Sequence, residues 1–144
     1  MIKRQPATIS VWTGRVLSAL VVVILLADAA VNLFAPHLLK AEMAAVGFPA
    51  DLAHVLAMLM LLCAAAYAYP PTAVLGAILV TGFFGGAICL HLRIGEIGSP
   101  PQLVCLAIGL MAWAGLFLRD ANVRAVLPVR RLAWRRPVRA VAHE

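Results

Sequence analysis

Long apolar segments, separated by short links rich in proline, glycine or charge, make up most of this chain. The four segments cover approximately residues 12–34, 51–69, 71–95 and 100–118. At 1.5 Å of rise per helical residue, segments of this length are suited to cross a bilayer core of ~30 Å. The pattern therefore predicts an all-α fold: a four-transmembrane-helix antiparallel bundle within residues 1–120, followed by a basic tail over residues 121–144.

The links and the glycines predict how these helices pack. Only Pro70-Pro71 separates the second helix from the third, so the two must be antiparallel neighbours. The third helix contains Gly82, Gly85 and Gly86, and a Gly-x-x-x-Gly spacing is typical of helices whose backbones approach closely. We therefore expect these three glycines to pack against another helix.

A cleaved signal peptide is the alternative for the first apolar segment. Lys3-Arg4 provides a basic start, and Ala27-Asp28-Ala29 is similar to a cleavage site. The apolar run continues to Phe34, however, which is too long for the apolar core of a signal peptide. The sequence therefore favours a retained membrane helix.

Composition and charge agree with a membrane protein. Apolar residues make up 64% of the chain and charged residues 12%, against roughly 25% charged residues in soluble domains. Ten of the twelve Lys and Arg residues lie in the terminal regions, and the opposite links hold only Lys40 and Arg93. The positive-inside rule then places both termini in the cytoplasm, with the protein in the inner (plasma) membrane. The residues expected in an aromatic belt at the inner interface are Trp12, Tyr67, Tyr69 and Phe117.

The arginine-rich tail has two interpretations. It could bind anionic lipid headgroups, at about 1 kcal/mol for each basic residue near the surface. It could instead only fix the topology, which is the interpretation we favour. Nucleic acid is excluded as a partner because no soluble domain accompanies the charge. The candidate lipid-binding residues are Arg124, Arg130, Arg131, Arg135 and Arg136.

Ionisable residues inside the apolar segments are few, and they gather near the predicted outer end of the bundle. Asp28 and Asn32 share one face of the first helix, where a carboxylate near the bilayer centre costs ~2.5–3.5 kcal/mol. Arg93 and Glu96 are expected to share a face and form an ion pair. The predicted polar cluster consists of Asp28, Asn32, His54, His91, Arg93 and Glu96.

This cluster could be a structural lock, in which Arg93 neutralises Asp28, or a pocket open to the outer side. The pocket would bind a small molecule, a quinone headgroup or a proton. We favour the lock, and the two can coexist. Haem between His54 and His91 is disfavoured because such a pair near an interface is usually solvated or hydrogen-bonded. A zinc site would need more ligands, so no metal site is predicted.

The three cysteines all lie in apolar segments. Cys89 and Cys105 are at matching depth, so they could form a redox pair on the oxidising side. We favour the alternative, in which both are small apolar packing residues. Cys63 has no partner at its depth.

Several short motifs occur in order along the chain: Gly47-Phe48-Pro49, Pro71-Thr-Ala-Val-Leu-Gly-Ala-Ile-Leu-Val-Thr-Gly82, Gly85-Gly86-Ala87, His91-Leu-Arg93-Ile-Gly95-Glu96 and Leu118-Arg119-Asp120. From about Leu25 to Arg131 the chain thus resembles the DoxX-like family of small four-helix membrane proteins. Asn32 replaces a lysine of the family pattern. The resemblance implies the fold, and by analogy a link to a quinone-reducing thiosulfate oxidoreductase or to an accessory role.

The residues support a binding or accessory role better than catalysis. No serine-nucleophile constellation, pair of acid and base carboxylates or phosphate-binding loop occurs in the sequence, so no catalytic residue is predicted. We expect an accessory or scaffold membrane protein, or one that binds a small molecule in a polar pocket near the outer face. The alternative, implied by the resemblance, is a membrane subunit of a quinone-linked redox system with a redox partner protein. A transporter is disfavoured because no inverted repeats are evident.

Overall fold

The computed structural model of the protein describes residues 7–126, and within this range the fold is entirely helical, which confirms the all-α prediction. Four long helices and two short ones follow one another. They are α1 (Ala7–Phe34), α2 (Lys40–Ala45), α3 (Ala53–Ala68), α4 (Ala73–Arg93), α5 (Pro100–Arg119) and α6 (Ala121–Val126), with 3-10 turns at Pro36–Leu38, Ala50–Leu52 and Pro70–Thr72.

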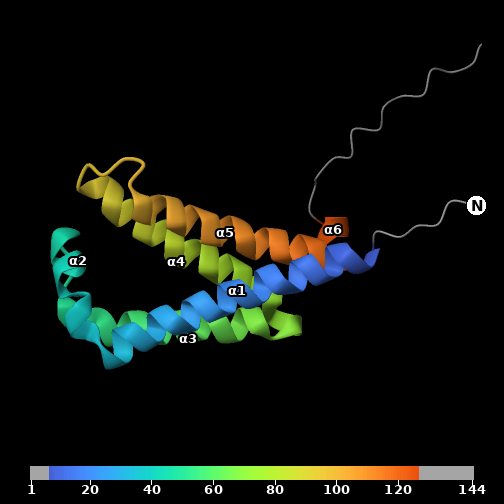
Figure 1. The fold of residues 1–144 in the computed structure, drawn as a ribbon, viewed down its shortest axis with the longest axis horizontal. Helices are drawn as coiled ribbons and strands as arrows, with labels where there is room; N and C mark the ends of the chain where they lie inside the picture. The colour runs from blue at the N-terminus through green and yellow to red at the C-terminus, as the bar shows by residue number, and fades with distance from the viewer. Residues whose placement is uncertain (1–6, 127–144) are drawn as a thin grey trace, which may run out of the picture.

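The four long helices form an antiparallel bundle. α1 packs against α3 and α5, and α4 packs against the same two helices, so each long helix has two main neighbours. The start of α1, the α3–α4 turn and the end of α5 lie at one end of the bundle (Figure 1). The α1–α3 and α4–α5 links lie at the other end. We call these the terminal end and the link end.

The segment between α1 and α3 contains a short helix that the sequence pattern did not reveal. α2 covers Lys40–Ala45 and lies across the link end of the bundle (Figure 1). Gly47, which has a positive φ of 65°, follows it and turns the chain toward α3. Six residues are too few to show a clear helical period in the sequence, so this helix depends on its tertiary contacts.

Close approach of the helix backbones defines the terminal end. A Cβ atom on Gly76 of α4 would lie 2.3 Å from the backbone nitrogen of Tyr67 in α3. A Cβ atom on Gly14 of α1 would lie 2.8 Å from the carbonyl oxygen of Gly115 in α5. Only glycine fits at these positions, because any side chain would push the two backbones apart.

Tyr67 connects three helices at the same end. Its side chain is fully buried, its hydroxyl donates to the Ala112 carbonyl of α5 at 2.7 Å, and it lies 3.1 Å from the Ser18 hydroxyl of α1. The predicted place of Tyr67 in an aromatic belt is therefore wrong, because the side chain points into the core. Trp12 and Tyr69 are exposed, with 60% and 61% of their surfaces accessible.

The prediction that Gly82, Gly85 and Gly86 pack against another helix of this chain is also wrong. A Cβ atom at any of the three would meet no atom within 4 Å among the described residues. The helices that would have to approach them are splayed apart toward the link end (Figure 1). The glycines that do pack lie at the terminal end, outside the Gly-x-x-x-Gly spacing.

The outer surface of the bundle is apolar. Large apolar side chains are exposed on all four long helices, and a soluble monomer rarely presents so continuous an apolar surface. α1, α4 and α5 supply segments long and apolar enough to cross a membrane (Ile9–Phe34, Pro70–Arg93 and Pro100–Arg119), whereas α3 is apolar but shorter. Examples of the exposed residues are Val23, Leu26, Met58, Leu62, Ile78 and Leu110.

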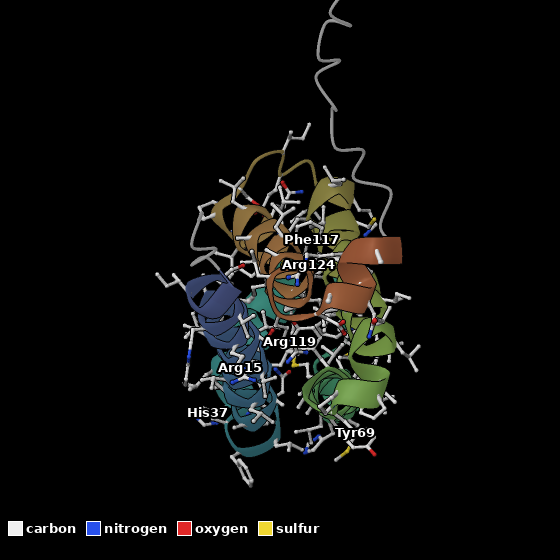
Figure 2. All side chains as sticks on the ribbon, turned by 90° about the vertical axis from the view of Figure 1, so that its right-hand side faces the viewer. Arg15, His37, Tyr69, Phe117, Arg119 and Arg124 are labelled. Atoms are coloured by element: carbon white, nitrogen blue, oxygen red, sulfur yellow. The ribbon has the colours of Figure 1, made fainter. Side chains whose placement is uncertain are left out.

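Arginine side chains gather at the terminal end, as the view along the bundle shows (Figure 2). The guanidinium carbon (Cζ) of Arg119 lies over the Tyr67 ring, 5.4 Å from the ring centroid. Arg124 donates from Nη1 to the carbonyl oxygens of Phe117 and Leu118, at 3.0 and 2.8 Å, and so caps the end of α5. The other proposed lipid-binding residues, Arg130, Arg131, Arg135 and Arg136, lie outside the described residues.

The contrast between the two sets of glycines can be tested by substitution with alanine. Gly76→Ala should lower the free energy of unfolding by about 1–3 kcal/mol, because the new methyl group overlaps the α3 backbone. Gly85→Ala, in the same helix but facing open space, is the matched control. Thermal unfolding in detergent micelles measures both, and equal midpoints for the two variants would contradict the packing described here.

Candidate functional site

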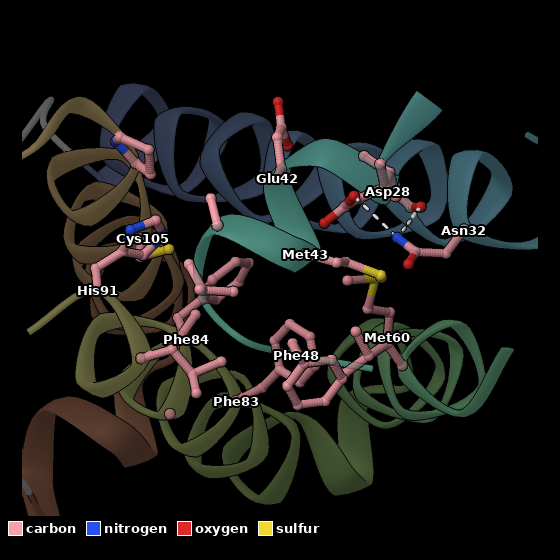
Figure 3. Close-up of a pocket in the computed structure, with 18 of the residues that line it drawn as sticks. Asp28, Asn32, Glu42, Met43, Phe48, Met60, Phe83, Phe84, His91 and Cys105 are labelled. Atoms are coloured by element: carbon pink, nitrogen blue, oxygen red, sulfur yellow. Dashed lines mark hydrogen bonds between the residues drawn. The ribbon is translucent and has the colours of Figure 1, made fainter. Parts of the chain in front are cut away.

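A cavity of about 810 Å³ lies toward the link end, where the bundle is splayed. All four long helices and α2 contribute to its wall (Figure 3). The volume is within the range of ~300–1,000 Å³ found for small-molecule sites. The cavity is therefore large enough to hold a small organic molecule. The polarity of its lining residues determines the chemical class of that molecule.

Most of the wall is apolar. Phe83 and Phe84 of α4 meet edge to face, with their ring centroids 5.4 Å apart and an interplanar angle of 84°. Phe48 and the thioethers of Met43 and Met60 face the same opening (Figure 3). Aromatic rings and flexible thioethers provide a surface that adapts to apolar molecules of different shape.

Two of the glycines once expected to pack helices line this cavity instead. Gly82 and Gly86, one helical turn apart on α4, form part of the wall. Because they have no side chain and nothing lies within 4 Å of their Cβ positions, the space in front of them stays open. Their contribution in this structure is cavity volume.

Asp28 and Asn32 of α1 form the first polar group in the wall. The Asn32 amide nitrogen donates to the Asp28 carbonyl at 3.0 Å and to its carboxylate at 3.3 Å (Figure 3). Asn32 is only 2% exposed, and its Oδ1 has no hydrogen-bond partner among the described residues. Both bonds are within one helix, so this pair does not tie α1 to its neighbours.

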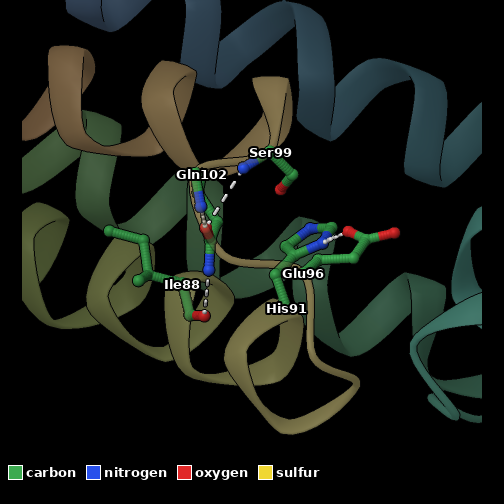
Figure 4. A network of polar contacts seen from close by, with 6 residues as sticks. Ile88, His91, Glu96, Ser99 and Gln102 are labelled. Atoms are coloured by element: carbon green, nitrogen blue, oxygen red, sulfur yellow. Dashed lines mark hydrogen bonds and ion pairs between the residues drawn. The ribbon is translucent and has the colours of Figure 1, made fainter.

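His91 and Glu96 form the second polar group. The His91 Nδ1 and a Glu96 carboxylate oxygen are 2.7 Å apart (Figure 4). This pairing replaces the predicted ion pair between Arg93 and Glu96. α4 ends at Arg93 and Gly95 takes a positive φ of 82°, so the chain reverses and Glu96 no longer follows the helical spacing.

Gln102 fixes the α4–α5 link beside this pair. Its side-chain oxygen accepts hydrogen bonds from the backbone nitrogens of Gly98 and Ser99, at 2.7 and 3.3 Å. Its side-chain nitrogen donates to the Ile88 carbonyl of α4 at 3.4 Å (Figure 4). The link is thus held to both helices by one buried amide, which keeps Ser99 and Glu96 at the edge of the cavity.

Arg93 and His54 are placed differently from the prediction. Arg93 donates from Nη2 to the Val46 carbonyl at 2.6 Å, so it joins the α1–α3 link to α4 and does not neutralise Asp28. His54 is exposed and does not line the cavity. Of the predicted cluster, the structure brings Asp28, Asn32, His91 and Glu96 to one cavity and leaves Arg93 and His54 outside it.

Glu42 is a polar residue of the cavity that sequence reasoning missed. It lies on α2 at the mouth, above the opening in Figure 3. The signal that could have found it was the unusual presence of Lys40 and Glu42 in a link between apolar segments. Without α2 as a predicted helix, nothing in the sequence placed Glu42 beside the space between the long helices.

The cysteines differ in their surroundings, and all three are free thiols. Cys105 lines the cavity, as His91 does (Figure 3). Cys89 is exposed, and Cys63 is buried in the core. The redox pair of Cys89 and Cys105, the alternative that the sequence disfavoured, is not joined in this structure, and Cys105 has a place in the cavity wall.

Loss of the Arg93 contact should loosen the α1–α3 link. In an Arg93→Gln variant, the backbone amides of Gly47 and Phe48 should exchange hydrogen about fivefold faster, since a partly exposed hydrogen bond contributes about 1 kcal/mol. Exchange measured by mass spectrometry checks this. Lys40→Gln removes a positive charge from the same link and is the matched control. Unchanged exchange in Arg93→Gln would show that the link is held by other contacts.

Comparison with known proteins agrees with this architecture. A family model described as the DoxX-like family matches residues 16–115, which include the four long helices from within α1 to near the end of α5. No curated protein and no solved structure matches the chain. Together with the apolar outer surface, the match shows that the chain is an integral membrane protein and belongs to the DoxX-like family.

Proposed function

We propose that this protein binds a small, largely apolar molecule in the cavity at the link end and acts as an accessory membrane component. The observation that carries the proposal is a cavity of about 810 Å³ with an apolar wall and convergent polar side chains at its edge. That combination is typical of ligand sites, in which apolar contacts provide affinity and a few polar groups orient the ligand.

The lock interpretation of the polar cluster has less support. A lock needs polar contacts between helices, yet the Asp28–Asn32 bonds lie within α1 and the His91–Glu96 pair lies within the α4–α5 region. The contacts of this region that do join separate parts are Arg93 to Val46 and Gln102 to Ile88, and they involve neither Asp28 nor His91. The polar residues are therefore better explained by what they present to the cavity.

We also propose that all four long helices cross the membrane. α3 has 16 residues, a length of ~24 Å, but it packs between α1 and α4, which are long enough to span. The 3-10 turns at Ala50–Leu52 and Pro70–Thr72 extend it at both ends. An apolar helix held alongside two spanning neighbours has the same depth in the bilayer as they have.

The proposed orientation has both termini in the cytoplasm and the cavity near the outer face of the plasma membrane. Both ends of the described chain lie at the terminal end, where Arg15, Arg119 and Arg124 gather (Figure 2). Positive residues favour the cytoplasmic side. In this orientation the arginine-rich tail would meet anionic lipids, although Arg124 already caps α5.

A quinone-linked redox subunit remains the second candidate. The aromatic wall and the volume of the cavity suit a quinone ring. The polar edge suits it less well. Quinone oxygens accept hydrogen bonds and need donors, but Asp28, Glu42 and the free oxygen of Asn32 are acceptors as well. Quinone that co-purifies in stoichiometric amount with the protein would favour this candidate, and it would require the donors to come from His91 or Ser99.

The proposed topology predicts which engineered thiols can be reached from outside the cell. In a cysteine-free background, Ile97→Cys in the α4–α5 link should react with a membrane-impermeant maleimide on intact cells. Ala121→Cys at the terminal end should react only after the membrane is opened. Both positions are exposed in the structure, so access to the reagent is the variable tested. The reverse pattern of labelling would overturn the orientation.

Ligand binding can be tested by filling the cavity. Gly86→Leu should weaken binding of an apolar fluorescent probe by about tenfold or more, because the new side chain occupies the space in front of α4. Gly85→Leu is the matched control, since it adds the same side chain to the adjacent residue, which does not line the cavity. Equal binding to the two variants would place the probe elsewhere and contradict the proposal.

A further inference from the structure

The charge of the cavity lining is unbalanced. Three acidic residues, Asp28, Glu42 and Glu96, are among those that line it, and no lysine or arginine of residues 7–126 is. Glu96 is paired with His91, which leaves Asp28 and Glu42 without a basic partner in the wall. Arg93, the basic residue nearest in sequence to this pair, is engaged with the Val46 carbonyl. The cavity wall therefore holds two carboxyl groups that no basic side chain of the wall neutralises.

A buried acceptor points to the same kind of ligand. Asn32 is buried, with 2% of its surface exposed, and its Oδ1 has no hydrogen-bond partner among the described residues. Its amide nitrogen already donates to the two Asp28 oxygens, which fixes the amide orientation and leaves Oδ1 as the free atom. Figure 3 shows the amide facing the opening. An unpaired buried acceptor is costly, so a ligand that donates a hydrogen bond here gains free energy.

Aromatic rings form the side of the cavity that faces these polar residues. Phe48, Phe83 and Phe84 line the cavity across the opening from Asp28 and Asn32 (Figure 3). The face of an aromatic ring is negative and attracts cations, most strongly where water is excluded. Carboxylates on one side and aromatic rings on the other form the combination that recognises organic cations.

We infer that the ligand of this cavity is a lipophilic organic cation, that is, an amine or quaternary ammonium group on an apolar body. The inference rests on the proposed binding function and adds the chemical class of the ligand. The cationic group lies beside Asp28, a protonated amine also donates to Asn32 Oδ1, and the apolar body fills the space in front of Gly82 and Gly86. Carboxylic acids, sulfonates and phosphates are rejected by the carboxylates of Asp28 and Glu42.

Cys105 provides a reporter inside the cavity. A Cys63→Ala, Cys89→Ala variant keeps Cys105 as the only thiol of the chain, and a bound molecule should slow its reaction with a maleimide. The protein is reconstituted in vesicles of the uncharged lipid digalactosyldiacylglycerol, which does not attract cations and has no ammonium group that could compete for the cavity. The probes are a phenylalkyl trimethylammonium ion and its neutral isostere, in which carbon replaces the nitrogen.

The cation should protect Cys105 at a concentration about tenfold lower than its neutral isostere. In an Asp28→Asn, Glu42→Gln variant this preference should fall to about threefold or less, while protection by the neutral probe stays the same. Glu42→Gln alone changes an exposed residue and should give an intermediate preference, which keeps the test valid if the double variant does not fold.

The outcomes separate this inference from the proposed function. Equal protection by the cation and the isostere would overturn the charge preference and leave ligand binding in place. No protection by either probe would overturn the proposed function itself. A cation preference that survives removal of both carboxylates would show that it arises outside this site, and would also overturn the inference.

Discussion

The Tyr67 hydroxyl has to find its hydrogen-bond partners inside the protein, because the side chain is fully buried. It reaches from α3 to the Ala112 carbonyl of α5 and to Ser18 of α1. These contacts need the helices to be close, and Gly115 makes this possible, since a Cβ atom there would lie 2.6 Å from the Ser18 hydroxyl. A polar group that must be satisfied in a dry core thus sets the spacing of three helices at the terminal end.

The cavity at the other end follows from the same constraint. Long helices held together at one end and tilted against each other must separate toward the other. Among the described residues, the glycines of α4 make no comparable contact at the link end: Gly82 and Gly86 face open space, and α2 lies across the opening. The bundle therefore combines a tightly packed half, which provides stability, with an open half that can bind a ligand without disturbing the helix contacts below it.

The division into a packed half and an open half explains where the polar residues lie: several of them line the cavity of the open half. Asp28, Asn32 and Glu42 have few partners within residues 7–126, although ionisable and amide groups at such positions are costly. Membership of the DoxX-like family establishes the fold and the membrane location and leaves the ligand open, since one fold serves many functions. What the cavity presents is therefore a better guide to its occupant than the family is: two carboxylates without basic partners, a free amide oxygen and three phenylalanine rings.

The sequence by itself determined the helical class, the approximate span of each long helix and the antiparallel order, because apolar length and proline-containing corners are local properties. It also placed Asp28 and His91 near the same end of the bundle, because position along each helix decides the end to which a residue belongs. It did not determine the packing glycines, the inward turn of Tyr67, the helix α2 with Glu42, or the partner of Glu96. Only the tertiary structure decided these, because they depend on how the helices are rotated and tilted and on how the links fold back, and such contacts join residues far apart in the chain.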